Sequence, residues 1–290
     1  MATLRDLRRK IAAVKKTQQI TKAMNMVAAA KLRGAQARME SFRPYAQSFA
    51  NMLGNLSRGV DPEIHPFFQR APIVEKVALV LMTADRGLCG SFNVNLINAG
   101  VKFMREKEAE GIGVSLTCVG RKGRDFFRRR KVEITHSYVD LWNKFDYSHA
   151  VTVGRDVMGE FLTGQVQEVY MIHAMFINVA IQRPRLVKLL PISPEETAEE
   201  AVGALEYIFE PPVEQFLELL LPKYVNTLVY HGFLENSASE HAARMTAMDN
   251  ASNNCAEMIG QLTLVMNKAR QAAITKELMD IVGGAEALKG

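Results

Sequence analysis

The sequence predicts an α/β protein with unusually long terminal helices. Two segments without proline, one near each end of the chain, carry apolar residues every three or four positions, as one face of a long helix does. The middle of the chain alternates short runs rich in valine and isoleucine with helix-like stretches, which is typical of a mostly parallel sheet. We therefore expect an antiparallel coiled coil of the two ends and a central α/β domain.

The N-terminal helix is expected over residues 3–43. Its stripe of apolar or small residues consists of Leu4, Leu7, Ile11, Val14, Thr21, Ala28, Leu32, Ala35 and Met39. Pro44 is expected to end or kink this helix because proline has no backbone N–H, and the helix can resume up to about Ser57.

The C-terminal helix is expected over residues 223–282, and Gly283 and Gly284 are expected to end it. Its stripe has near-heptad spacing and consists of Ala242, Met245, Met248, Cys255, Ile259, Leu262, Met266, Ala269 and Ala273. Polar residues replace leucine in the middle of the N-terminal stripe, at Gln18, Thr21 and Asn25. Polar core layers cost stability and are usually kept for register or for contact with a partner.

The central domain is built from short elements. The predicted strands are Lys76–Thr83, Val114–Val119, Val132–Thr135, Val166–Asn178 and Leu186–Leu190. Asn93–Gly111 and Tyr147–Gly164 are the predicted helices, and the proline-containing segments Pro62–Pro72 and Pro184–Glu200 are predicted loops. The chain therefore divides into an N-terminal coiled-coil helix, the α/β domain and a C-terminal coiled-coil helix, over residues 1–58, 74–210 and 212–290.

Composition excludes several classes of protein. The three cysteines are far apart, which argues against a disulfide scaffold or a cysteine-rich zinc module, and no apolar run approaches the roughly 20 residues of a membrane-spanning helix. The first 40 residues hold ten Lys or Arg and two Asp or Glu, whereas the whole chain carries a net charge of only +5. Such an electropositive segment predicts an acidic partner.

The loop after the first strand, Asp85–Gly90 (DRGLCG), is the main local candidate for chemistry. Loops at this position often bind phosphate, but this one lacks both GxGxxG and GxxxxGK[ST]. A tight turn with Ser91 or Asn93 as the helix N-cap is the favoured interpretation, and an activated thiolate at Cys89 beside Arg86 is a weaker one.

Other charged and titratable groups give weaker signals. Residues 121–131 (RKGRDFFRRRK) could contact RNA or acidic lipid, but an amphipathic helix with Phe126 and Phe127 facing inward is favoured. The six histidines show no ligand spacing, so we expect no metal, and the sequence indicates no cofactor. A Rossmann-like nucleotide-binding enzyme with a helical dimerisation arm and a basic coiled-coil binder of nucleic acid stay open as alternatives.

The two ends of the chain resemble the gamma subunit of bacterial F-type ATP synthases. The resemblance rests on three segments together with the DRGLCG loop, namely Ile11–Lys31 (IAAVKKTQQITKAMNMVAAAK), Glu235–Ala251 (ENSASEHAARMTAMDNA) and Asn267–Ala285. It implies an antiparallel coiled coil of the terminal helices with a central Rossmann-like α/β domain at its foot. It also implies a non-catalytic central rotor shaft that couples rotation of the membrane c-ring to conformational cycling of catalytic sites on beta subunits.

The resemblance implies partners rather than a reaction. The expected partners are the alpha and beta subunits, the epsilon subunit and the c-ring, with no nucleic acid. A start at Met1 without a transit segment points to a bacterial protein, peripheral to the cytoplasmic face of the inner membrane. The implied partner-binding residues are Lys22, Met24, Asp85, Arg86, Cys89 and Arg244, then Gln271, Thr275, Glu277, Leu278 and Ile281 towards the tip with Ile274 and Val282, and Tyr207, Phe209 and Glu210 against the ring.

Overall fold

The structure is a computed structural model that describes residues 3–58, 62–192 and 212–287. It contains two compact units, the first formed by residues 1–28 with 245–290 and the second by residues 29–244. Two long helices contribute to both units, α1 (Leu4–Arg58) and α5 (Val213–Ala287).

In the first unit, α1 and α5 run antiparallel to each other. The Gln18 side-chain amide donates to the carbonyl of Ser252 at 3.3 Å, and the Asn25 amide donates to the carbonyl of Met245 at 2.9 Å. Residue numbers therefore rise along one helix as they fall along the other. Because Gln18 and Asn25 use backbone carbonyls as acceptors, the two polar layers are satisfied inside the helix pair, as such layers must be.

The predicted stripes of both helices are confirmed. Every residue of the two stripes is buried or half-buried, and most of their neighbours are exposed. Leu7 retains 7% exposure and Met248 retains 4%. The apolar periodicity of 3.5 to 3.6 residues is thus what selects the faces that meet.

The long helices extend past the expected ends. Pro44 does not end α1, and the expected continuation to about Ser57 is confirmed because α1 reaches Arg58. The helix α5 starts at Val213, before Pro222 and ten residues before the expected start at Lys223. The cost of a proline inside a helix, about 3 kcal/mol, is offset by buried neighbours such as Phe49 and Leu53. Gly283 and Gly284 do not end α5 either, because a glycine costs a helix only about 1 kcal/mol.

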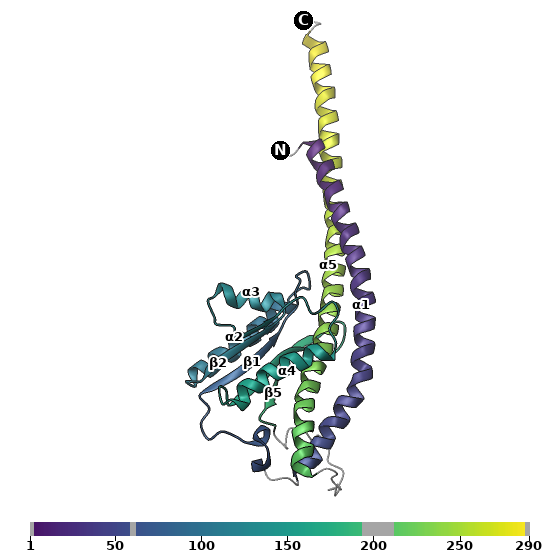
Figure 1. The fold of residues 1–290 in the computed structure, drawn as a ribbon. Helices are drawn as coiled ribbons and strands as arrows, with labels where there is room; N and C mark the ends of the chain where they lie inside the picture. Colours follow the sequence, from purple (N-terminus) through teal and green to yellow (C-terminus); the bar gives the residue numbers. More distant parts are fainter. Residues whose placement is uncertain (1–2, 59–61, 193–211, 288–290) are drawn as a thin grey trace. The chain divides into compact units, whose positions relative to one another are not determined.

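The second unit contains a five-stranded sheet in the order β3-β2-β1-β4-β5 (Figure 1). The strands are β1 (Lys76–Met82), β2 (Gly113–Val119), β3 (His136–Tyr138), β4 (Glu168–Phe176) and β5 (Gln182–Leu190). The first four are parallel, and β5 is an antiparallel edge strand that pairs with β4. The expected α/β sheet is therefore confirmed.

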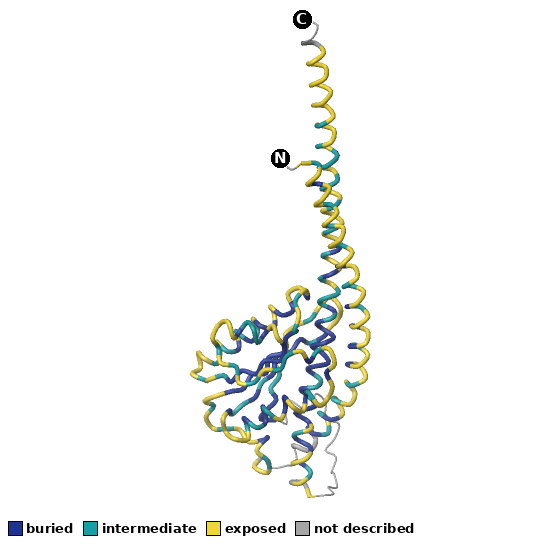
Figure 2. The backbone as a smooth tube through the Cα atoms, turned by 45° about the horizontal axis from the view of Figure 1, so that its top comes forward, coloured by how far each residue is buried: buried dark blue, intermediate teal, exposed yellow. Residues whose placement is uncertain are grey.

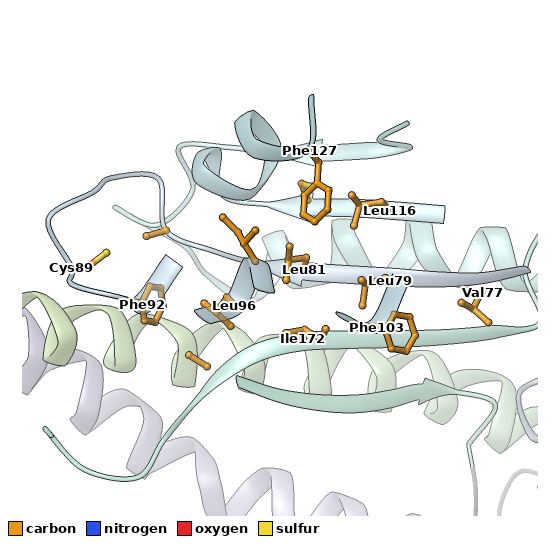
Figure 3. Close-up of a cluster of buried hydrophobic side chains, with 14 residues drawn as sticks. Val77, Leu79, Leu81, Cys89, Phe92, Leu96, Phe103, Leu116, Phe127 and Ile172 are labelled. Carbon is orange, nitrogen blue, oxygen red and sulfur yellow. The ribbon is translucent and has the colours of Figure 1, made fainter. Parts of the chain in front are cut away.

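One face of the sheet packs against α2 (Phe92–Ala109) and α3 (Arg121–Arg129). Alternate residues of β1 supply Leu79 and Leu81 to a core that also holds Phe103 from α2 and Phe127 from α3 (Figure 3). The period of two follows from strand geometry, which places successive side chains on opposite faces. The dark blue of the strands in Figure 2 marks this buried layer.

The opposite face packs against α5 and α4 (Tyr147–Leu162). A Cβ atom added at Gly232 of α5 would lie 3.0 Å from the Met171 side chain of β4, so glycine lets this helix approach the sheet closely. Within the second unit α1 and α5 are again antiparallel, since Phe42 stacks on Tyr230 and Phe49 on Tyr224 with ring centroids 4.9 and 5.6 Å apart. These edge-to-face pairs add to area burial.

Two predictions about the sheet need correction. Val132–Thr135 is not a strand, because the Val132 amide closes the end of α3 by donating to the Phe127 carbonyl, and the strand begins at His136. The loop predicted from Pro184 is instead β5 up to Leu190, since an edge strand tolerates proline. The segment 62–72 contains two short 3-10 helices, Pro62–Ile64 and Pro66–Phe68.

Candidate functional site

The Asp85–Gly90 loop is a tight turn between β1 and α2. Leu88 and Gly90 have positive φ angles of 64° and 58°, a backbone conformation that only glycine adopts easily. The Asn93 side chain fixes the turn, because its oxygen accepts from the Ala84 amide at 2.9 Å and its nitrogen donates to the Arg86 carbonyl at 3.3 Å. The interpretation as a helix-entry turn is confirmed in part: Ser91 is the N-cap residue, without a capping hydrogen bond from its side chain.

A buried ion pair attaches this loop to α5. The Arg244 guanidinium donates to the Gly87 carbonyl and lies 2.6 Å from the Glu240 carboxylate, with side chains only 12% and 9% exposed. Burial raises the pKa of Glu240 above its usual value, and Arg244 opposes that shift without cancelling it. Arg244, expected at a partner interface, is thus engaged inside the chain.

The loop residues have different environments. The Asp85 carboxylate accepts from the Arg121 amide at 2.8 Å, whereas the Arg86 side chain is exposed. Cys89 is buried, with 1% exposure, and burial raises the pKa of its thiol. Burial and a raised pKa both oppose an activated thiolate, so the structure does not support the catalytic interpretation of Cys89.

Leu88 is a loop residue that the sequence analysis missed. It is 64% exposed at the tip of this firmly held turn. Its exposure leaves the side chain accessible to a partner. The sequence signal that could have found it is an apolar residue between glycines, outside any periodic stripe.

In the first unit, the expected contact residues on α1 lie at its surface. Lys22 is exposed and Met24 is half-buried. All ten basic residues of the first 40 are exposed, so their positive charge is available to partners. Three apolar residues near Met24, which the sequence analysis did not select, are also exposed: Ile20, Met26 and Val27, at 60%, 69% and 57%.

Within the described residues of the first unit, the C-terminal part of α5 has no partner helix. The pairing register in the first unit places the start of α1 opposite residues near Met266, and α5 continues alone to Ala287 (Figure 1). Figure 2 shows this end exposed, and Gln271, Thr275 and Glu277 all lie on the surface. Its apolar residues are exposed by half or more, namely Ile274, Leu278, Met279, Ile281 and Val282.

Four further expectations concern the c-ring contact, metal binding, membrane spanning and the basic segment 121–131. Tyr207, Phe209 and Glu210 lie outside the described residues. Residues 3–58, 62–192 and 212–287 contain no group of three or more side chains suited to hold a metal ion. Across the same described ranges, every helix is too short or too polar to span a bilayer. In the basic segment 121–131, Phe127 is buried and Phe126 packs beside it, which confirms the amphipathic helix.

Comparisons with known proteins identify the family. Residues 3–288 match the family model described as ATP synthase. The ATP synthase gamma chains of Nitratidesulfovibrio vulgaris and Syntrophobacter fumaroxidans are 51% and 54% identical to this chain, over the full length of both chains in each comparison.

Solved structures agree on the fold. A chain in the central stalk and c-ring structure of Tetrahymena thermophila mitochondrial ATP synthase has 27% identity and a TM-score of 0.62, covering 80% of this chain and 99% of that chain. A chain in the Euglena gracilis mitochondrial ATP synthase structure has 21% identity and a TM-score of 0.69, covering 98% of this chain and 94% of that chain. Together with the full-length sequence relatives, these matches place the protein in the ATP synthase gamma-chain family.

Proposed function

We propose that the chain acts as the central rotor of a proton-translocating F-type ATP synthase. In this role it couples rotation of the membrane c-ring to the conformational cycling of catalytic sites on the beta subunits. The chain itself is a non-catalytic subunit, peripheral to the cytoplasmic face of a bacterial inner membrane. Its partners are the alpha and beta subunits, the epsilon subunit and the c-ring.

The unpaired end of α5 is the observation that carries this proposal. Exposed apolar side chains are costly in water unless another molecule covers them, and five large ones gather on the last four turns of this helix. A collar formed by the alpha and beta subunits would bury them. Leu278 and Ile281 would supply apolar contact there, and Gln271, Thr275 and Glu277 would face the surrounding loops.

The basic surface of α1 supports a second contact. Lys22 and its neighbours would face an acidic loop of the beta subunits, with Met24, Met26 and Val27 adding flexible apolar contact. Exposed ion pairs contribute only about 0–1 kcal/mol each. Contacts of this strength can be exchanged as a shaft turns, whereas a deep energy minimum at one angle would stop it.

The Asp85–Gly90 loop would form a third contact, at the lower rim of the beta subunits. Arg86 and Leu88 are the exposed residues of this loop, and we assign them the direct contact. Cys89, Asp85 and Arg244 would act by holding the loop in shape, since each is engaged within the chain. Tyr207, Phe209 and Glu210 are proposed to contact the c-ring on the basis of the family resemblance alone.

Reconstitution tests the proposal. The purified chain should hydrolyse no ATP by itself, and it should restore rapid hydrolysis when mixed with alpha and beta subunits. A variant in which Ile274, Leu278 and Ile281 are all replaced by aspartate should co-assemble much less well, and a matched variant with aspartate at the exposed polar positions Gln271 and Thr275 should lose much less. Failure of the unmodified chain to assemble with alpha and beta subunits would refute the rotor role.

A further inference from the structure

A cavity of about 530 Å³ lies in the second unit, away from the Asp85–Gly90 loop. It is bounded by β4, β5 and the parts of α1 and α5 that belong to this unit. The volume is within the range of about 300–1,000 Å³ that is usual for sites of small molecules. Nothing in the proposed rotor function uses this cavity.

Two guanidinium groups and an imidazole line the cavity from three elements. Arg43 comes from α1, Arg185 from β5 and His231 from α5. Burial lowers the pKa of His231, and the positive charges of both arginines act on it in the same direction, so the three groups are near one another. Within the described ranges neither arginine forms an ion pair with a carboxylate.

A buried histidine also lines the cavity. The side chain of His173 on β4 is 2% exposed, and its Nε2 lies 2.8 Å from the carboxylate of Glu235. Its other ring nitrogen, Nδ1, has no hydrogen-bond partner in the described part of the chain. This nitrogen is itself closed off from solvent, so it does not face the open space of the cavity.

The acidic residues near the cavity do not neutralise it. Among the described residues that line the cavity, Glu235 is the only carboxylate, and it is bonded to His173 at 2.8 Å with His231 Nε2 3.9 Å away. Burial acts to raise the pKa of Glu235, but the bond from His173 and the nearby positive charges lower it overall. Lys188, a third cation in the wall, is paired with Glu168 at 2.6 Å. Among the described residues, the guanidinium groups of Arg43 and Arg185, both solvent-exposed, are therefore left without a carboxylate partner.

We propose that this cavity binds an anion carrying a diphosphate group, either free pyrophosphate or the diphosphate of a nucleotide. The two guanidinium forks offer parallel N–H donors, and guanidinium geometry matches phosphate oxygens. The volume exceeds what one phosphate would fill, and the apolar wall formed by Met175, Tyr224 and Leu228 leaves room for an organic part. The proposal is independent of the rotor role.

Calorimetry on the full-length purified chain tests this proposal, with pyrophosphate and ADP as the two probes at near-physiological salt. Both Arg185→Gln and Arg43→Gln should weaken binding by about tenfold or more, because each removes a charge-assisted contact. The matched control is Arg183→Gln, two residues along the same strand and outside the cavity wall, which should change affinity by less than about twofold. Circular dichroism confirms that each variant folds.

The two probes distinguish the source of the diphosphate. If ADP binds more tightly than pyrophosphate, the apolar wall contacts the nucleoside. If the two probes bind equally, the site recognises the diphosphate alone. Absence of binding for both probes up to about 5 mM would overturn the proposal. Equal weakening by Arg183→Gln and Arg185→Gln would overturn it too, because diffuse attraction to a basic surface, and no defined site, would then explain the binding.

Discussion

Replacement of Arg244 by glutamine tests how the Asp85–Gly90 loop is held. The substitution removes the positive partner of Glu240, a carboxylate that is 9% exposed, and the donor to the Gly87 carbonyl. Removing one partner of a buried ion pair costs about 3–5 kcal/mol, because the other charge is left without compensation. Since Arg244 is itself 12% exposed, we expect the lower end, about 3 kcal/mol, at neutral pH.

The stability loss caused by Arg244→Gln depends on pH through the protonation of Glu240. Burial raises the pKa of Glu240 in the folded chain above the usual 4.5, so the folded state holds this proton more tightly than the unfolded state. The resulting stability is complete below the unfolded pKa and is lost as pH rises through the folded pKa. Without Arg244 the folded pKa rises further. The loss caused by Arg244→Gln should therefore be smaller at about pH 5 than at about pH 7.5.

Urea unfolding, followed by the fluorescence of Trp142, provides the assay. Trp142 is the only tryptophan, and it packs in the second unit against Phe145 and Phe233 with ring centroids 5.7 and 5.5 Å apart. The double variant Arg244→Gln with Glu240→Gln should recover about half of the loss or more, since no charge is then left buried. A loss below about 1 kcal/mol at neutral pH, or a double variant no more stable than the single one, would refute the reasoning.

Three further predictions concern the core and the paired helices. Phe233→Ala, at a fully buried position, should lower the unfolding free energy measured by circular dichroism by about 3–5 kcal/mol. The control Leu219→Ala, at a position 64% exposed, should change the unfolding free energy by no more than about 0.5 kcal/mol. Equal losses would contradict the burial of Phe233 in the core. Burial lowers the pKa of His241 to about 4, so its contribution to stability is lost as pH falls from 6.5 towards that value, and His241→Asn should be less sensitive than the unmodified chain between pH 7 and about pH 5. A variant as acid-sensitive as the unmodified chain would show that His241 is not the group responsible. Asn25→Leu should raise the thermal midpoint of the helix pair, because leucine removes a polar layer; a lower midpoint would mean that the Asn25–Met245 bond stabilises more than leucine would.

Periodicity predicted the faces of the long helices but not their ends. The stripes of α1 and α5 follow from helical spacing alone, which is a local property of the sequence. The rule that a proline ends a helix fails at Pro44 and Pro222. Tertiary packing, which only the folded chain shows, outweighs the local cost of proline at both positions. The strand β5 was shortened for the same reason, since its edge position, which tolerates Pro184, depends on the order of the sheet.

The candidate site was partly predictable. The DRGLCG turn and the basic surface of α1 are contiguous in sequence and could be found there. The bond from Arg244 to Gly87 and the pairing of His173 with Glu235 join residues far apart in the chain, so no pattern of spacing announces them. The sequence analysis missed Leu88 because a single leucine in a loop forms no pattern, and its backbone conformation is known only from the structure.

A reversible cross-link measures the rotor role most directly. A cysteine placed at Met24, in a chain whose half-buried Cys255 is replaced by alanine, would be oxidised against a cysteine in the acidic loop of a beta subunit in the assembled complex. The account predicts that ATP hydrolysis stops when the cross-link forms and returns when the disulfide is reduced. Unchanged hydrolysis by fully cross-linked complexes would contradict it, because a shaft fixed to its bearing cannot turn.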